Sequence, residues 1–135
     1  MPTLSHAGRA FLAAERFAVL ATVGPDGSPH QAVVWYRLEG DEIVVNSAVG
    51  RRWPADLLRD SRTMLTVEDG YRYVQVSGEV TVVRDQRTAQ ADIAEMARRY
   101  HADEPDEAED LIANRFTRQQ RISFRLRPSH IKEEL

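Results

Sequence analysis

Runs of apolar residues, some continuous and some alternating with polar residues, predict a protein made mostly of β-strands. Residues 17–23 form a nearly continuous apolar run, which is typical of a strand buried on both faces. In the long segment 71–83 the side chains alternate sides, so that four valines share one face: Val74, Val76, Val80 and Val82. We predict six strands: residues 17–23, 30–38, 42–48, 63–67, 71–83 and 122–126.

Helical spacing of apolar residues predicts several helices around these strands. We expect them at residues 5–15, from near Pro54 through Asp60, at 86–100, and from Pro105 onward. The chain 1–135 is then one domain, with an N-terminal helix (1–16), strands over 17–127 interrupted by a helical insertion (86–116), and a loose tail (128–135). Six mostly antiparallel strands are expected to close as a barrel, because closure removes exposed edges.

Composition narrows the classes of function. Hydrophobic residues make up 42% of the chain and charged residues 29%, as in an ordinary globular domain. A net charge of −3 argues against a nucleic-acid partner, and the lack of cysteine excludes disulfides and thiolate chemistry. No apolar run approaches the ~20 residues of a membrane helix, and the N-terminal residues lack the pattern of a signal peptide. We therefore expect a cytoplasmic protein that makes no membrane contact.

Familiar catalytic motifs are missing from the sequence. The four histidines are scattered, without metal-ligand spacing, and no serine stands in a Gly-x-Ser-x-Gly elbow. The acidic residues in segment 104–110 are interpreted as a solvated helix face, so we predict no metal site and assign no catalytic residue. Any redox chemistry would have to come from a bound cofactor.

One segment does suggest binding chemistry. A predicted strand ends in Asn46, Ser47 and Ala48, and after Gly50 the chain presents Arg51 and Arg52 just before a helix. Two guanidinium groups beside the amides of a helix N-terminus form a natural seat for a phosphate group. On this local pattern alone, the alternative is that both arginines are solvated loop residues.

Four segments taken together carry a family resemblance: Val19–His30, Val34–Tyr36, Asp56–Arg62 and Val76–Val80. In their order and spacing they resemble the pyridoxamine-5'-phosphate-oxidase-like superfamily of FMN-binding split barrels, over nearly the whole chain. The stretch Asp56–Asp60 is similar to a pattern found in the branch that uses the deazaflavin coenzyme F420.

The resemblance implies an all-β dominated fold with inserted helices, namely a six-stranded antiparallel split β-barrel with peripheral helices. It also implies a homodimer with two equivalent cofactor sites at its interface. In such a site Arg51 and Arg52 would bind the cofactor phosphate. The other implied contacts are Asn46, Ser47 and Ala48 along the ribityl chain or ring edge, and Val33, Val34 and Trp35 near the ring system.

The implied function is hydride transfer between coenzyme F420 and a small conjugated or imine-containing substrate. The alternative cofactor is FMN, which carries a single phosphate. Oxidation of pyridoxamine phosphate is not expected, because segment 31–36 lacks the two basic residues that flank the apolar stretch in those oxidases. A protein that binds a cofactor or ligand without turnover is the remaining alternative, because no acid or base is evident.

Overall fold

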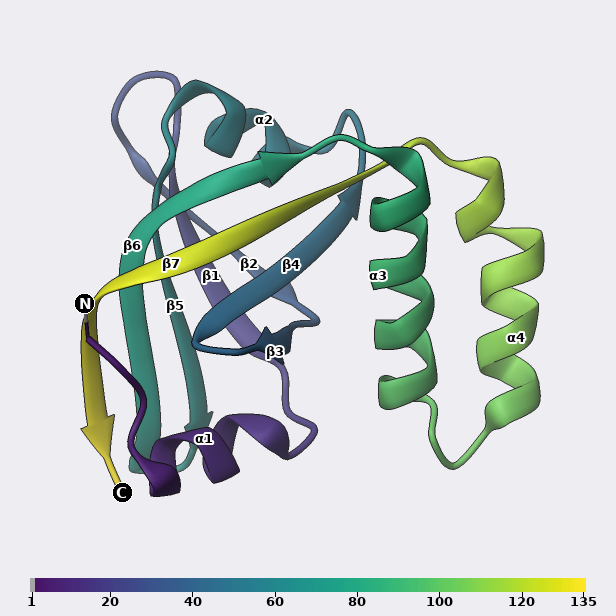
Figure 1. The fold of residues 1–135 in the computed structure, drawn as a ribbon. Helices are drawn as coiled ribbons and strands as arrows, with labels where there is room; N and C mark the ends of the chain where they lie inside the picture. Colours follow the sequence, from purple (N-terminus) through teal and green to yellow (C-terminus); the bar gives the residue numbers. More distant parts are fainter. Residues whose placement is uncertain (1) are drawn as a thin grey trace.

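A computed structural model describes residues 2–135, which form one antiparallel sheet with helices around it (Figure 1). The strands are β1 (Ala18–Val23), β2 (Pro29–Val34), β3 (Arg37–Glu39), β4 (Glu42–Ala48), β5 (Arg62–Asp69), β6 (Arg72–Val83) and β7 (Arg121–Glu134). The helices are α1 (His6–Ala13), α2 (Arg52–Arg59), α3 (Gln86–Tyr100), α4 (Pro105–Asn114) and the short 3-10 helix η1 (Phe116–Arg118). No helix within residues 2–135 has the length and hydropathy needed to cross a membrane.

The order of the strands explains why the sheet curls. Across the sheet the strands lie in the order β2-β1-β5-β6-β7-β4-β3, so β2 and β3 occupy opposite edges. Yet only Trp35 and Tyr36 separate these two strands in the sequence. Because two residues span only ~7 Å, the sheet must bend until its edges approach each other. This curled shape is visible in Figure 1, and it encloses the main hydrophobic core.

The predicted second strand, residues 30–38, is wrong as a single element. It breaks at Tyr36 into β2 and β3, which raises the number of strands in the described chain from six to seven. The backbone N–H of Tyr36 donates to the Tyr100 hydroxyl, and its carbonyl accepts from Arg99. Since side chains of α3 satisfy both groups, the backbone of Tyr36 needs no partner strand at this position.

The predicted loose tail, residues 128–135, is also wrong. β7 continues through Glu134 and pairs with β6 from Ser123 to Glu134, across an irregularity at Ser77 and Gly78. A side chain on Gly78 would meet the carbonyl of Arg127 at 2.2 Å, so this close crossing depends on glycine. The alternation predicted for 71–83 is confirmed, because Val74, Val76 and Val80 are buried.

The predicted helices are confirmed with small shifts of their ends. Ser5 caps α1 by accepting from the backbone N–H of Gly8 at 2.9 Å, as its position suggested. The insertion folds into α3 and α4, which lie side by side to one side of the sheet (Figure 1). A second hydrophobic cluster joins α3 to β4 through Val44, Ile93 and Met96. The insertion is therefore anchored to β4, the strand that ends just before the predicted phosphate-binding residues Arg51 and Arg52.

Candidate functional site

One pocket lies where β2, β4, the start of α2, the insertion and β7 meet. Its volume is about 250 Å³. The residues that line it are Val33, Val34, Trp35, Asn46, Ser47, Arg51, Trp53, Ile93, Arg115, Phe116 and Arg121. The pocket thus combines apolar and aromatic walls with three arginines.

The pocket gathers six of the eight residues predicted for a cofactor site: Val33, Val34, Trp35, Asn46, Ser47 and Arg51. Ala48 and Arg52 are not among its lining residues, and Arg52 is exposed at the first turn of α2. Five lining residues were missed by sequence reasoning: Trp53, Ile93, Arg115, Phe116 and Arg121. The last three follow β4 by about seventy residues in the chain, and no local pattern links them to it.

The turn at Gly50 places Arg51 at the pocket. Gly50 has a φ of +100°, a backbone conformation that residues other than glycine rarely adopt. Arg51 then occupies the N-cap position of α2, but its side chain makes no capping hydrogen bond. The Arg51 side chain, which lines the pocket, therefore takes no part in the helix cap.

Asp56 fixes α2 against the sheet. Its carboxylate is 2% exposed and accepts hydrogen bonds from Thr22 (2.8 Å), His30 Nδ1 (2.8 Å) and Arg59 (2.9 Å). Burial raises the pKa of this carboxyl, but the hydrogen bonds from His30, Thr22 and Arg59 outweigh burial and hold the pKa below its usual value. The family-like segment Asp56–Asp60 thus has a structural role, because it anchors the helix that begins beside Arg51.

Aromatic rings form much of the pocket wall. Trp35 stacks on Tyr100 of α3, with ring centroids 5.0 Å apart and an angle of 6° between planes. Phe116 of η1 meets Trp35 edge-on, at 6.4 Å. Across the pocket, Trp53 packs on the buried ring of Phe124. Trp35, Trp53 and Phe116 thus contribute aromatic surface to the pocket lining, and a planar ring system packs well against such surface.

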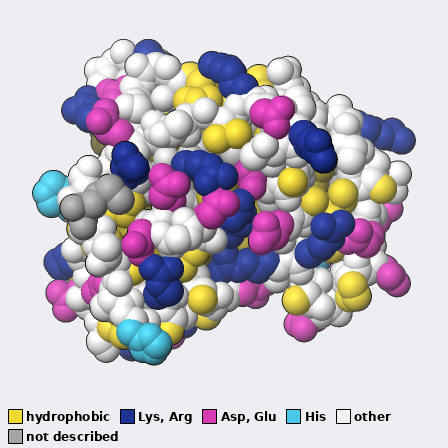
Figure 2. Space-filling model, viewed as in Figure 1, with side chains coloured by type: hydrophobic (Ala, Val, Ile, Leu, Met, Phe, Trp, Pro, Cys, Tyr) yellow, Lys and Arg dark blue, Asp and Glu magenta, His cyan; other side chains and the backbone are white. Residues whose placement is uncertain are grey.

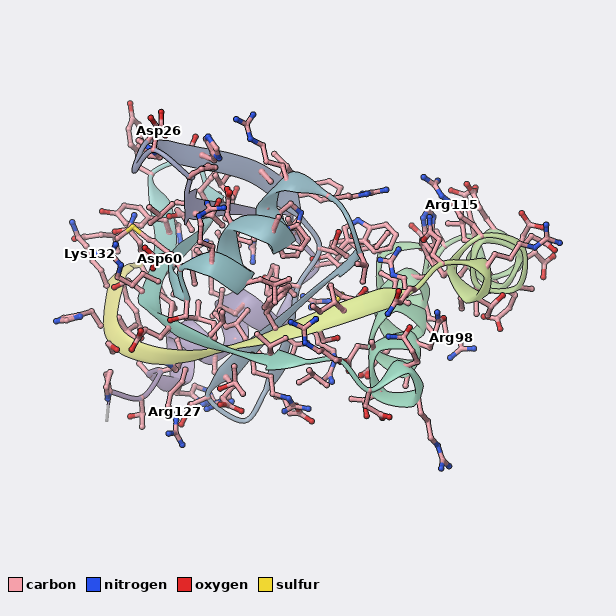
Figure 3. All side chains as sticks on the ribbon, turned by 90° about the horizontal axis from the view of Figure 1, so that it is seen from above. Asp26, Asp60, Arg98, Arg115, Arg127 and Lys132 are labelled. Carbon is pink, nitrogen blue, oxygen red and sulfur yellow. The ribbon has the colours of Figure 1, made fainter. Side chains whose placement is uncertain are left out.

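Positive charge accumulates at the polar end of the pocket. Arg51, Arg115 and Arg121 all line it, and none of the three has a salt-bridge partner within residues 2–135. Burial, together with the nearby positive charges of Arg51 and Arg115, lowers the pKa of Arg121 to about 10. Figure 3 shows Arg115 beside helices α3 and α4, on the side of the molecule away from Lys132. Elsewhere charges are mixed, as on the face in Figure 2, where basic and acidic side chains are interspersed.

A trio outside the pocket, His101, Glu104 and Glu107, has potential ligand atoms within 4.8 Å of one another. Both glutamates are exposed, as expected for a solvated helix face. The hydrogen bond and negative charge of Glu107 raise the pKa of the Glu104 carboxyl. Exposed acidic groups of this kind commonly occur without an ion, so the absence of a metal site stays a prediction.

Comparison with known proteins defines the class. The model of the pyridoxamine 5'-phosphate oxidase family matches residues 4–133, so this chain belongs to that family. The resemblance deduced from the four sequence segments is thereby confirmed. No curated protein sequence matches the chain.

Several solved structures share the fold. The conserved hypothetical protein Rv2991 from Mycobacterium tuberculosis is 25% identical, with a TM-score of 0.79 over 96% of this chain and 83% of that one. An F420 reductase is 22% identical, with a TM-score of 0.73 over 93% of this chain and 96% of the other. HutZ, the heme storage protein from Vibrio cholerae, is 17% identical, with a TM-score of 0.71 over 98% and 95%. At such identities the last two comparisons establish the fold alone.

Proposed function

We propose that this chain is an oxidoreductase that holds a flavin-type coenzyme in the pocket between β4, α2 and the insertion. The leading coenzyme is the deazaflavin F420, and the alternative is FMN. The observation that carries the proposal is the pocket itself, which combines aromatic side chains with Arg51, the N-cap residue of α2, and Arg51 has no salt-bridge partner within residues 2–135. An F420 reductase among the fold's neighbours supports the choice of deazaflavin.

The lining residues fit such a coenzyme. Val33, Val34 and Trp35 would contact the ring system, and Arg51 would bind the phosphate. Ser47 donates to the carbonyl of Ala48 at 3.0 Å, so its oxygen can still accept a hydrogen bond from a ribityl hydroxyl. When bound, the coenzyme supplies the hydride chemistry, with a small conjugated or imine-containing molecule as acceptor. We place this activity in the cytoplasm.

A second candidate, binding without turnover, has one observation in its favour. The lining residues include no carboxylate, histidine, tyrosine or lysine that would hand over a proton. HutZ, which shares the fold, is described as a heme storage protein. The two candidates differ in one measurement, namely whether the bound, reduced coenzyme is oxidised by any member of a panel of enones, imines and quinones.

Titration with F420 and with FMN tests the proposed site directly. Both tryptophans of the chain, Trp35 and Trp53, line the pocket, so a bound coenzyme is expected to quench most of the intrinsic fluorescence. Arg51→Gln is expected to weaken binding of the preferred coenzyme ~10-fold to 100-fold, because a charge-assisted hydrogen bond contributes ~1.5–3 kcal/mol.

Two further variants sharpen this titration. Arg52→Gln should weaken binding less than Arg51→Gln, since Arg52 lies outside the pocket lining. Arg87→Gln removes an exposed arginine of α3 and serves as the control with unchanged affinity. Equal effects of Arg51→Gln and Arg87→Gln would reject the site.

We also propose that a second copy of this chain completes the pocket. A volume of about 250 Å³ lies below the ~300–1,000 Å³ of typical ligand sites. Val33 lines the pocket and is nevertheless 70% exposed, so the wall that it forms is open on one side. Next to Val33, the outer face of β1 and β5 presents further apolar residues, namely the exposed Met64 and the partly exposed Val19, Ala21 and Val23. A homodimer packed through this face would cover them and close the pocket.

Val33→Glu is therefore expected to convert a dimer into a monomer at micromolar concentration, because it would bury an unpaired carboxylate at the interface. Sedimentation velocity measures this change. Tyr71→Glu is the control, since Tyr71 is fully exposed at the turn between β5 and β6. A wild-type monomer, or a Val33→Glu variant that remains dimeric, would contradict the assembly.

A further inference from the structure

Within residues 2–135, Arg121 is a buried cation whose partners are all neutral. It is 4% exposed, at the first position of β7. Its Nε donates to the Asn46 amide oxygen at 3.0 Å and its Nη1 to the Gln119 amide oxygen at 2.6 Å, while the guanidinium lies 4.9 Å from the centre of the Phe116 ring. Its Nη2 donates to no residue in 2–135, and this atom keeps some accessible surface in a residue that lines the pocket.

Another largely buried arginine of this chain, Arg37, is paired with carboxylates. Arg37, which is 13% exposed, lies 2.6 Å from a carboxylate oxygen of Asp92 and 3.5 Å from one of Glu95. Buried charges are normally paired in this way, because an isolated charge loses its hydration without compensation. Around Arg121 the nearby charges are instead those of Arg51 and Arg115, which are also positive. The arrangement therefore lacks an anion.

A chain of hydrogen bonds holds Arg121 in place without using its charge. The Asn46 amide group donates to the carbonyl of Ala89 (2.9 Å) and to Ser123 (2.8 Å), which turns the amide oxygen toward Arg121. Ser123 in turn donates to Asp92 at 2.7 Å. Two residues, Asn46 and Ser123, thus stand between Arg121 and the carboxylate of Asp92 in this chain of hydrogen bonds. Asn46 is a positioning residue in this arrangement, because both ends of its amide are engaged with protein.

We propose that Arg121, together with Arg51 and Arg115, binds a ligand group that carries at least two negative charges at the inner end of the pocket. The proposal deepens the function proposed above, since a coenzyme phosphate would be that group. Two sources share the chemistry, namely the phosphate monoester of FMN and the phosphodiester with carboxylate tail of F420. It also gives the insertion a role, because the insertion supplies Arg115 and places Phe116 against Arg121.

The test compares each coenzyme with its counterpart that lacks the anionic group. FMN is paired with riboflavin, and F420 with the deazaflavin nucleoside without phosphodiester and tail, by calorimetric titration. Arg121→Gln is expected to weaken binding of the preferred anionic coenzyme roughly 10-fold to 100-fold, with less than ~3-fold change for its uncharged counterpart. The coenzyme whose binding is weakened, FMN or F420, is the one that supplies the anionic group. Equal losses for both members of a pair, or no loss, would overturn the proposal.

Further variants keep the test decisive if Arg121→Gln does not fold. Arg115→Gln changes an exposed side chain that makes no hydrogen bond within residues 2–135, and it should also reduce the advantage of the anionic coenzyme. Arg118→Gln, three residues further on and outside the pocket lining, is the matched control. If the anionic coenzyme still binds more tightly than its uncharged counterpart by the same factor in Arg115→Gln, that result would count against the three-arginine site.

Inorganic pyrophosphate separates this proposal from the proposed function. If neither coenzyme binds, but pyrophosphate raises the melting temperature of the wild type and not that of Arg121→Gln or Arg115→Gln, the anion site stands and the coenzyme assignment fails. If a coenzyme binds equally well to the wild type, to Arg121→Gln and to Arg115→Gln, the coenzyme assignment stands and the anion site fails.

Discussion

Asp56→Ala is expected to lower the free energy of unfolding by about 3 kcal/mol, a loss on the order of 10 °C in melting temperature. The variant would leave Thr22, His30 and Arg59 without their shared acceptor, and Thr22 is only 3% exposed. Urea denaturation of the purified protein measures the effect. Asp60→Ala is the control, since Asp60 pairs with the exposed Arg62 and should change stability little. Equal losses from the two variants would contradict the anchoring role of Asp56.

The lowered pKa of the Asp56 carboxyl also predicts how the stability of the protein depends on pH. Because folding lowers the pKa of Asp56, its contribution is fully present above the ordinary carboxyl pKa of ~3.9 and is lost as pH falls through the lower pKa of the folded state. The fall in wild-type stability below about pH 4 should therefore be shallower in Asp56→Ala. Since Asp56 anchors the helix that starts beside Arg51, the variant should also weaken coenzyme binding although it lies outside the pocket lining.

Tyr36→Ala is expected to lower the free energy of unfolding by ~3–5 kcal/mol, the usual range for removing a large buried aromatic ring. Tyr36 is fully buried at the joint between β2 and β3, where the curled sheet comes together. Its hydroxyl donates to the carbonyl of Leu12 at 2.8 Å, and burial raises the pKa of this hydroxyl, so that it stays protonated as a donor.

Tyr36→Phe separates the ring from the hydroxyl. The Leu12 carbonyl still accepts a hydrogen bond from Arg99 at 3.1 Å, so the loss should be about 1 kcal/mol or less. Chemical denaturation followed by far-ultraviolet circular dichroism measures both variants. A Phe variant as unstable as the Ala variant would show that the hydroxyl, and not the ring, holds the joint together.

Local pattern predicted much of the fold because the relevant physics is local. Apolar alternation in 71–83 identified the buried face of β6, and Ser5 identified the start of α1. The break at Tyr36 escaped prediction because its cause lies about sixty residues away, in the side chains of Arg99 and Tyr100. The extension of β7 escaped because its polar, proline-containing sequence resembles a tail, and only pairing with the long strand β6 makes it a strand.

The candidate site divides in the same way. In the sequence alone, Gly50 and the arginine that follows it before a helix suggest a phosphate seat, and the resemblance to a known family points to the residues of β2 and β4. Only the tertiary structure brings in Arg115, Phe116 and Arg121. The physical reason is that a strand pattern specifies which face a residue occupies but not which distant element covers it. Packing of the insertion against β4 decided which charges meet in the pocket, and the lack of a carboxylate among them became visible only then.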